Sequence, residues 1–361
     1  MANIISIGTA VPEHKHAQED ILYFMQKAFG LNNDEKRKLA FLYHHSSINT
    51  RYSVIPDFGQ PEAEWSFIPT DPAAPFPSLD KRMALYTQHS LPLSVEAIND
   101  CLDGYIHPSE ITHLITVSCT GMSAPGLDLQ VVEAMGLAAN INRTSVNFMG
   151  CYAAIHALKL AKMICDTHED ANVVIVATEL CTLHFQQEFT IDNAASSLLF
   201  ADGSAAILVT SKTTAPHALT LRSFYSQIAF KGKNDMGWEI SNKGFLMSLS
   251  AYIPQLIQED ISSLVENALA NGNLTTGDIT HWCIHPGGKK ILEVIQKQMH
   301  LCDCQMAYSK EVLSNYGNMS SASVLFVLKS MMEKMPNAPA NVFGVAFGPG
   351  LTMETFIASS V

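Results

Sequence analysis

Three pairs of matching segments recur in the same order along the chain, and each pair is separated by nearly the same distance. The sequence Ile-Thr-His opens an apolar run at Ile111 and again at Ile279, an offset of 168 residues. Gly150 and Gly317 each open a helical pattern, an offset of 167, and Asn-Val pairs at residues 172 and 341 open strand-like runs, an offset of 169. A repeat of this length predicts one structural unit that is present twice.

Each half of the repeat alternates short apolar runs with helical patterns. Continuous apolar runs are typical of strands buried on both faces of a sheet, and their alternation with helices is typical of α/β layering. In the first half the strand-like runs are 4–9, 113–118, 145–149, 172–178 and 205–210. We therefore expect two fused α/β halves, residues 1–212 and 213–361, with the boundary near residues 211–216.

The composition narrows the class of protein. Hydrophobic residues make up 47% of the 361 residues and charged residues 16%, which is typical of a globular chain with a sizeable core. The net charge of −12 argues against a nucleic-acid partner but leaves room for a local basic patch that binds an anionic small ligand.

Neither export nor membrane insertion is expected. No apolar run approaches the roughly 20 residues that span a bilayer, and the first ten residues lack the basic start of a secretory signal. The eight cysteines are scattered, so we expect reduced thiols and no disulfide framework. A cytoplasmic protein without a membrane partner is predicted.

Cys151 is the first candidate for chemistry, because it follows Gly150 at a predicted junction between a strand and a helix. Backbone N–H groups at a helix N-terminus are unpaired and carry partial positive charge, which favours the nucleophilic thiolate. Such a position can lower a cysteine pKa from about 8.5 to about 3.5–7.5. The alternative interpretation is a small buried residue of the core.

His285 ends a strand-like run and is followed by a Pro-Gly-Gly turn, which would leave its imidazole at a strand end, where α/β folds place their sites. It could equally be a hydrogen-bonded core residue. His281, Cys283 and His285 also share one strand face, but their spacing is not that of a usual zinc site, so we expect no metal.

Asn318 stands in the second half where Cys151 stands in the first. Asparagine is a favoured helix N-cap, so a structural role is open, but its side-chain N–H groups could instead point at a substrate carbonyl. If the halves are related by a pseudo-twofold axis, Cys151, His285 and Asn318 face one cavity. A thiolate that takes an acyl group, beside two donors that stabilise an enolate oxygen, suits acyl transfer and carbon–carbon bond formation.

These residues lie in runs that resemble type III polyketide synthases, the chalcone synthase-like family of the thiolase superfamily. The matching runs are INTR at 48–51, VNFMGCYAA at 146–154, LFADGSAA at 199–206, IHPGG at 284–288, NYGNMSSAS at 315–323 and GVAFGPG at 344–350. They stand in the family's order and cover most of the chain.

The resemblance implies an α/β chain with the thiolase fold, a duplicated five-layered αβαβα arrangement with pseudo-twofold symmetry, in a homodimer. It implies that Cys151 holds the starter and the growing chain as a thioester. His285 and Asn318 would bind the malonyl thioester carbonyl and promote decarboxylation, and Phe200 would orient the malonyl group. Acyl-CoA and malonyl-CoA are the implied substrates, with no cofactor, and the product would be a pyrone, a phloroglucinol or a resorcinol.

The resemblance also implies which residues surround the substrate. The cavity residues would be Cys119, Cys181, His184, Trp238, Met247 and Ser320, and the CoA contacts would be Lys38, Gly287, Gly288, Lys289 and Lys290. Plant chalcone synthases carry small hydroxyl residues in place of Cys181 and His184, and often glycine in place of Trp238, so a narrower initiation pocket is expected. Phe41 and His45 replace two basic positions of the family's CoA entrance, and Ala124 stands near a methionine that crosses the dimer interface in plant members.

Two other functions stay open at this point. An enzyme similar to β-ketoacyl-acyl-carrier-protein synthase III would have the same three residues, use a carrier protein and stop after one condensation. The turn after His285 and the loop at 348–350 favour the polyketide group. An inactive binding subunit on the same fold would be expected to lose the nucleophile or its partners, and all three are present.

Overall fold

The computed structural model describes residues 1–71, 74–212, 218–336 and 338–360. Nine strands form one mixed sheet. In spatial order they are β11 (His281–Ile284), β12 (Asn341–Gly348), β13 (Thr352–Ser359), β8 (Leu219–Ile228), β1 (Asn3–Ala10), β7 (Asp202–Thr210), β6 (Asn172–Leu180), β4 (His113–Ser118) and β5 (Asn142–Asn147). Two antiparallel pairs lie outside this sheet, β2 (His14–Ala17) with β3 (Thr50–Ser53) and β9 (Met236–Ser241) with β10 (Gly244–Leu249).

The same strand pattern runs outward in both directions from the junction between β1 and β8. In the first half β1 pairs antiparallel with β7, β7 antiparallel with β6, and β6 parallel with β4. In the second half β8, β13, β12 and β11 pair in the same order and the same directions. The junction itself has only two residue pairs, Asn3 with Thr220 and Ile4 with Leu219. The predicted duplication with pseudo-twofold symmetry is confirmed.

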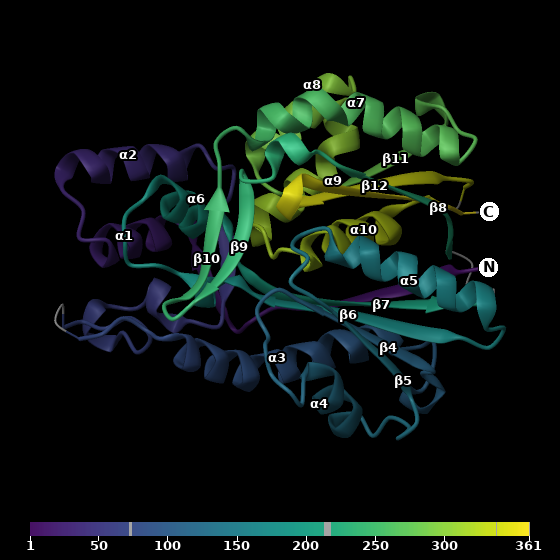
Figure 1. The fold of residues 1–361 in the computed structure, drawn as a ribbon, viewed down its shortest axis with the longest axis horizontal. Helices are drawn as coiled ribbons and strands as arrows, with labels where there is room; N and C mark the ends of the chain where they lie inside the picture. The colour runs from purple at the N-terminus through teal and green to yellow at the C-terminus, as the bar shows by residue number, and fades with distance from the viewer. Residues whose placement is uncertain (72–73, 213–217, 337, 361) are drawn as a thin grey trace.

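We call the two parts of the sheet wings: the first wing is β1, β7, β6, β4 and β5, and the second is β8, β13, β12 and β11. Helices cover the outer faces of both wings and fill the space between them (Figure 1). The outer helices are α3 (Leu79–Leu102) and α4 (Leu127–Ala134) on the first wing, and α7 (Ile253–Asn271) and α8 (Lys289–Gln298) on the second. Between the wings lie α5 (Ala153–Thr167) and α10 (Ala322–Lys334). These five layers are the αβαβα arrangement of the thiolase fold that the sequence predicts.

The remaining helices lie around this stack. At one end of the molecule are α1 (Gln18–Ala28), α2 (Asn33–His44) and α6 (Ile191–Leu199), while α9 (Asp303–Tyr316) packs against β11 and α10. The face of α5 that includes Ile155 and Leu158 is buried. On α10 every residue from Ala322 to Leu328 is buried, because that helix is covered on all sides.

The N-terminal apolar segment is β1, which lies between β7 and β8 in the sheet. Most of the predicted boundary between the halves, residues 213–216 of 211–216, lies outside the described residues. Across the described ranges, no helix is both long and apolar enough to cross a bilayer.

The prediction for residues 145–149 is wrong in both position and burial. The strand there, β5, spans Asn142–Asn147 and is exposed along most of its length, because it forms the edge of the sheet. Phe148 leaves the strand with φ of 61°, so the apolar Phe148 and Met149 belong to the turn before α5. The two side chains are apolar because of the environment of that turn, and neither residue is part of a buried strand.

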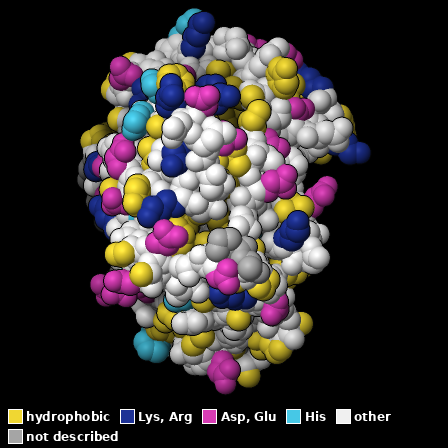
Figure 2. All heavy atoms as spheres, turned by 90° about the vertical axis from the view of Figure 1, so that its left-hand side faces the viewer, with side chains coloured by type: hydrophobic (Ala, Val, Ile, Leu, Met, Phe, Trp, Pro, Cys, Tyr) yellow, Lys and Arg dark blue, Asp and Glu magenta, His cyan; other side chains and the backbone are white. Residues whose placement is uncertain are grey.

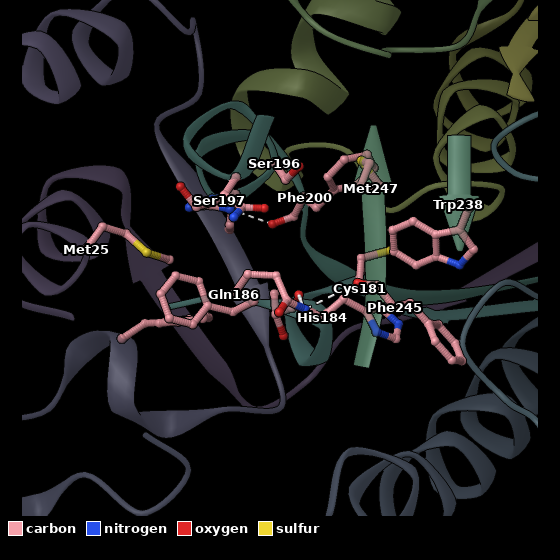
Figure 3. Close-up of a pocket in the computed structure, with 15 residues that line it drawn as sticks. Met25, Cys181, His184, Gln186, Ser196, Ser197, Phe200, Trp238, Phe245 and Met247 are labelled. Carbon is pink, nitrogen blue, oxygen red and sulfur yellow. Dashed lines mark hydrogen bonds between the residues drawn. The ribbon is translucent and has the colours of Figure 1, made fainter. Parts of the chain in front are cut away.

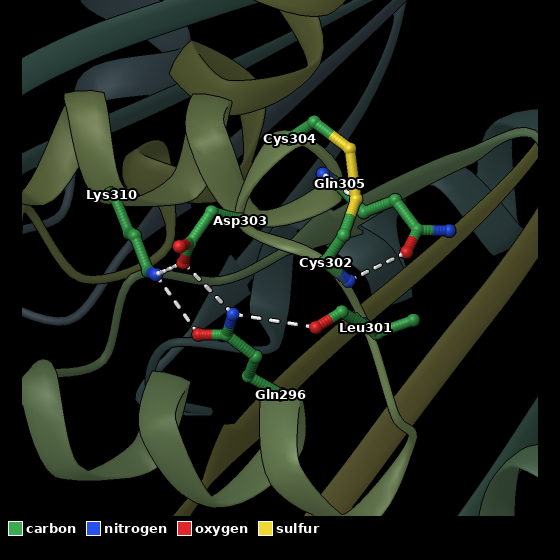
Figure 4. The surroundings of a disulfide bond; sticks show 7 residues. All are labelled: Gln296, Leu301, Cys302, Asp303, Cys304, Gln305 and Lys310. Carbon is green, nitrogen blue, oxygen red and sulfur yellow. Dashed lines mark hydrogen bonds and ion pairs between the residues drawn. A yellow bond between two sulfur atoms is a disulfide. The ribbon is translucent and has the colours of Figure 1, made fainter.

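The prediction that the cysteines are reduced is wrong for one pair. Cys302 and Cys304 form a disulfide at the N-terminus of α9, with their Cα atoms 5.3 Å apart (Figure 4). Beside it, Lys310 contacts Asp303 at 2.7 Å and the amide of Gln296 at 2.9 Å. A bridge between residues two positions apart closes a very short loop, so it is no framework between distant segments. The other six cysteines are free thiols.

Candidate active site

Four chain turns bring the predicted catalytic residues to one cavity. Cys151 lies in the turn between β5 and α5, His285 directly follows β11, Asn318 lies between α9 and α10, and Phe200 ends α6. All four line one cavity, whose empty volume with its mouth is about 650 Å³. Two of them come from each predicted half, so the cavity lies where the halves meet.

A short backbone bridge between the halves holds Phe200 beside Asn318. The N–H of Asn318 donates to the carbonyl of Leu199 at 2.9 Å, and the N–H of Ala201 donates to the carbonyl of Asn318 at 2.9 Å. The backbone of Asn318 is therefore attached on both sides to the chain that carries Phe200.

Asn318 is not the N-cap of α10, which was the alternative interpretation. The helix begins at Ala322 with Ser321 as N-cap, because Ser320 has a φ of 48° and adds a turn before the helix. The Oδ1 atom of Asn318 accepts the N–H of Ser320 at 2.8 Å. With its oxygen occupied in this way, the side chain can offer its Nδ2 hydrogens to a ligand in the cavity.

His285 is held by its backbone, while its ring faces the cavity. Its N–H donates to the carbonyl of Val345 at 2.9 Å, which continues the pairing of β11 with β12. The side chain is buried, and among the described residues neither ring nitrogen has a hydrogen-bond partner. Burial lowers the pKa of the imidazole to about 3, so the ring is neutral at pH 7.

The environment of Cys151 differs from the expected one. The residue is half-buried and faces the cavity, and the surrounding protein raises the pKa of its thiol to about 12 by desolvation, more than hydrogen bonds from Ser320 and Asn318 lower it. The predicted lowering of the pKa at the helix N-terminus is therefore outweighed by this desolvation. Transfer of the proton to His285 would create a thiolate and an imidazolium, and their attraction would offset part of the cost of desolvating each.

Glycines allow the backbone to pack closely around Cys151. A Cβ atom on Gly150, whose φ is 81°, would lie 2.3 Å from the Cδ of Pro349, and one on Gly348 would lie 2.6 Å from the ring of Tyr152. The loop that contains Pro349 thus lies directly against the turn of the nucleophile, which requires the absence of side chains at both glycines.

Five of the six predicted cavity residues line the same cavity as the four catalytic candidates, together with Gly287. The five cavity residues are Cys119, Cys181, Trp238, Met247 and Ser320. The sixth, His184, lines an adjoining space that shares Cys181, Phe200, Trp238 and Met247 as a common wall. Figure 3 shows these side chains around that space. Cys181 and His184 lie on a short 3-10 helix, Trp238 and Met247 on β9 and β10, and Phe200 at the end of α6. Sequence reasoning did not identify Leu199, Met236, Leu249, Ile291 or Phe347, which complete the apolar wall.

Three rings, those of Trp238, His184 and Phe245, line one side of the adjoining space. The indole N–H of Trp238 donates to the carbonyl of Cys119 at 3.0 Å, which fixes the ring. His184 lies edge-on to Trp238, with ring centroids 4.8 Å apart, and stacks on Phe245 at 4.5 Å. His184 is itself fixed by a contact of 3.0 Å between its Nε2 and the hydroxyl of Thr120.

The predicted CoA contacts lie outside the cavity, apart from Gly287. Lys38 is exposed on α2, while Gly288, Lys289 and Lys290 form the N-terminus of α8, where Lys289 lies 3.9 Å from Glu293. Figure 2 shows the face that includes α1 and α2, with Lys and Arg side chains interspersed among Asp and Glu. A helix N-terminus with two lysines is suited to a phosphate, and CoA binding there stays a prediction.

A metal was considered for His281, Cys283 and His285. In the described part of the chain, no three His, Cys, Asp or Glu side chains are grouped so as to hold a metal ion. Cys283 donates to the carbonyl of Val324 at 3.5 Å within the core, away from the cavity.

Glu179 is a buried acid that sequence reasoning missed. It accepts the N–H of Cys119 at 2.8 Å and the hydroxyl of Ser321, and it is fully buried. It thereby joins the cavity residue Cys119 to the turn that carries Asn318. The sequence signal was a single acid near the end of the apolar run of β6.

Burial raises the pKa of Glu179 from 4.5 to about 7, which predicts a pH-dependent stability. The folded state then holds the proton more tightly than the unfolded state, so stability falls as pH rises from about 4.5 to 7, by up to about 3 kcal/mol. Glu179→Gln keeps the shape of the side chain but removes the carboxyl group that titrates. Urea unfolding of both proteins at several pH values should show their difference in free energy changing over this range, and a constant difference would contradict the shift.

Comparisons with known proteins agree with this geometry. Residues 1–213 match the family of chalcone and stilbene synthases, N-terminal domain, and residues 221–361 match the C-terminal domain of the same family. A relative from Mycobacterium tuberculosis, the alpha-pyrone synthesis polyketide synthase-like Pks18, is 30% identical over 98% of this chain and 90% of its own length.

Solved structures give the same result. The C-terminal type III polyketide synthase domain of Steely1, a type I/III hybrid from Dictyostelium, superposes with a TM-score of 0.92 at 26% identity, over 100% of this chain and 99% of that one. PKS-I from the brown alga Ectocarpus siliculosus superposes with a TM-score of 0.89 at 27% identity, over 99% and 98%. The chain therefore belongs to the chalcone and stilbene synthase family within the thiolase superfamily, and it is a type III polyketide synthase, a condensing acyltransferase.

Proposed function

We propose that this enzyme extends an acyl-CoA starter by iterative decarboxylative Claisen condensation with malonyl-CoA and then cyclises the product. The starter would be held as a thioester on Cys151. A pyrone, a phloroglucinol and a resorcinol are the candidate products, and the relative named for alpha-pyrone synthesis makes a pyrone the first to look for.

The first step loads the starter. The sulfur of Cys151 attacks the thioester carbonyl of the acyl-CoA, and the CoA sulfur leaves. The proton released by Cys151 passes to His285 and from there to the departing CoA sulfur, which balances the exchange. A neutral imidazole is the form that can accept this proton, in agreement with the lowered pKa of His285.

The second step forms the carbon–carbon bond. The thioester carbonyl of malonyl-CoA accepts hydrogen bonds from the imidazole of His285 and the Nδ2 of Asn318. The bond to the carboxylate breaks, CO2 leaves, and the electron pair forms an enolate that the two donors stabilise. The enolate carbon attacks the thioester on Cys151 and the Cys151 sulfur leaves, so the extended chain becomes a CoA thioester. For the next round the Cys151 sulfur attacks that thioester, the CoA sulfur leaves, and the chain is again held on Cys151. Decarboxylation drives the reaction, so the proposal includes no cofactor.

The observation that carries the proposal is the state of His285. Both of its ring nitrogens are buried beside Cys151 and Asn318 without a hydrogen-bond partner in the described residues. A buried polar atom without a partner is costly, which is consistent with a partner supplied by the substrate.

Product mass spectrometry tests the proposal. The purified enzyme is incubated with malonyl-CoA and a panel of acyl-CoA starters. We expect products that are heavier than the starter by two or more decarboxylated malonyl units. A single extension, or activity only with malonyl groups on a carrier protein, would refute iterative use of CoA thioesters and favour a fatty-acid-type ketosynthase.

Trp238 is expected to limit the size of the starter, because its indole occupies the wall of the cavity. Trp238→Ala should raise kcat/KM for bulky starters relative to small ones, on the order of 10- to 200-fold. Trp238→Phe is the matched variant, since it removes the hydrogen bond to Cys119 but keeps most of the bulk. Competition between two starters measures the ratio, and an equal shift in both variants would show that bulk is not the cause.

We also propose that the enzyme is a homodimer. The edge strand β5 is exposed along residues 142–145, and the nearby loop at 122–125, which contains Ala124, is exposed as well. An unpaired strand edge is a template for another strand, and a twofold axis would place the same edge of a second copy against it. Size-exclusion chromatography with light scattering tests this, and a monomer at micromolar concentration would contradict it.

A further inference from the structure

The bridge between Phe200 and Asn318 rests on a buried arginine. Arg51 lies on β3 and is only 3% exposed. Its Nη1 donates to the carbonyl of Phe200, and its Nε donates to the Oε1 of Gln18 at 2.9 Å. Gln18 in turn donates from its Nε2 to the carbonyl of Leu198 at 2.8 Å. One guanidinium and one amide thus hold the chain on both sides of Leu199.

The same arginine also contacts the other strand of the bridge. A Cβ atom on Gly317 would lie 2.8 Å from the Cδ of Arg51 and 2.9 Å from its Cγ, so the arginine stem packs directly against the residue that precedes Asn318. Gly317 has a φ of 68°, a conformation that glycine adopts without strain. Arg51 is therefore in contact with both chain segments whose pairing places Phe200 and Asn318.

Charged and polar groups surround the buried guanidinium of Arg51. Burial lowers the pKa of Arg51, and the nearby groups of Tyr43 and Asp202 act against that change. Asp202 follows the bridge and accepts the N–H groups of Val54 and Thr182, each at 2.8 Å. A buried cation thus contacts the carbonyl of Phe200, and a buried acid directly follows Ala201 and is bound to two other segments of the N-terminal half.

We propose that Arg51 is a positioning residue of the proposed reaction. It holds Phe200 and Asn318 in the geometry that decarboxylation requires, without contacting the reacting atoms. Its guanidinium donates to Gln18 and to the carbonyl of Phe200 in two different directions, which a lysine ammonium at the end of a flexible stem does not reproduce. Loading of Cys151 should be much less sensitive to Arg51 than decarboxylation, because Cys151 lies on a different turn.

The test compares Arg51→Lys with Arg82→Lys. Arg82 is the matched control, since it is also fully buried and donates to two backbone carbonyls, Pro77 and Leu183, but does not contact the bridge. In Arg51→Lys we expect CO2 release from malonyl-CoA to fall about 10²-fold, as for a misplacement of about 1 Å. Acylation of Cys151 by a starter, followed by intact mass, should stay within about threefold of wild type. Equal losses in both steps, or equal losses in both arginine variants, would overturn the proposal.

A second measurement does not depend on the reaction. The N–H groups of Asn318 and Ala201 are hydrogen-bonded in the bridge, so hydrogen exchange of peptides covering them should be about tenfold faster in Arg51→Lys and unchanged in Arg82→Lys. Gln18→Ala, which removes only the support of Arg51, should accelerate the same amides to a lesser degree, and it serves as the test if Arg51→Lys does not fold. Unchanged exchange in these variants would overturn the positioning role. If wild type itself releases no CO2, the proposed function fails, while the exchange result still decides whether Arg51 holds the bridge.

Discussion

Cys151→Ala should lower the rate of polyketide formation at least about 10³-fold, while substantial decarboxylation of malonyl-CoA should remain. Without the sulfur there is no thioester for the enolate to attack, so no new carbon–carbon bond forms on the enzyme. His285 and Asn318 remain in the cavity, and they are the donors proposed to stabilise the enolate. The measurement is parallel detection of CO2 and of extended products.

The matched control for this variant is Cys165→Ala. Cys165 is a buried cysteine on α5, the helix that Cys151 precedes, but it faces the core. This control should form products at the wild-type rate, apart from any loss of stability from the smaller side chain. Continued polyketide synthesis by Cys151→Ala would mean that another residue carries the acyl chain.

His285→Ala and Asn318→Ala should each lower the rate of CO2 release about 10²- to 10³-fold, which is the usual effect of removing one donor to a developing oxyanion. Each variant removes a hydrogen bond that is stronger to the enolate than to the ground-state carbonyl. Single-turnover CO2 release with saturating malonyl-CoA measures this step apart from loading and product release. Each loss should appear in the rate at saturation, because the donors act on charge that develops during the reaction.

Two nearby residues of the same types provide controls. His281 begins β11, the strand that His285 directly follows, and contacts the hydroxyl of Thr280. Asn315 is exposed on α9, three positions before Asn318. Their alanine variants should release CO2 at the wild-type rate. Full CO2 release from both His285→Ala and Asn318→Ala would refute the assigned roles of these two residues.

The repeat predicts two related α/β halves, because it carries information at the level of layers, while the five-layered thiolase fold is what the family resemblance implies. Offsets between matching segments do not depend on where each strand begins or ends, and the pairing of β8, β13, β12 and β11 reproduces that of β1, β7, β6 and β4. Local boundaries were less predictable. The edge strand β5 was misplaced because Phe148 and Met149 are apolar for the sake of the turn and not of the strand.

The site was predictable as a set of residue types, while its electrostatics were not. Motifs locate Cys151, His285 and Asn318, but a pKa depends on how completely neighbouring atoms exclude water, and no motif contains that information. The same reason hides Glu179, since a single acid in an apolar run gives no hint of the two groups that bind it. The disulfide was missed because nothing in the spacing of Cys302 and Cys304 distinguishes a bonded pair from two exposed thiols.

Because the two wings meet at the cavity, enzymatic activity requires both wings to be folded and correctly joined. Each wing can bury much of its own sheet, but Phe200 and Asn318 are held together by a bridge between segments that are far apart in the chain. A partly assembled protein could therefore keep most of its helix and strand content while its active site is still open. Turnover is accordingly a stricter indicator of the native state of this enzyme than circular dichroism, and loss of turnover before loss of ellipticity in denaturant would reveal the order in which the two wings separate.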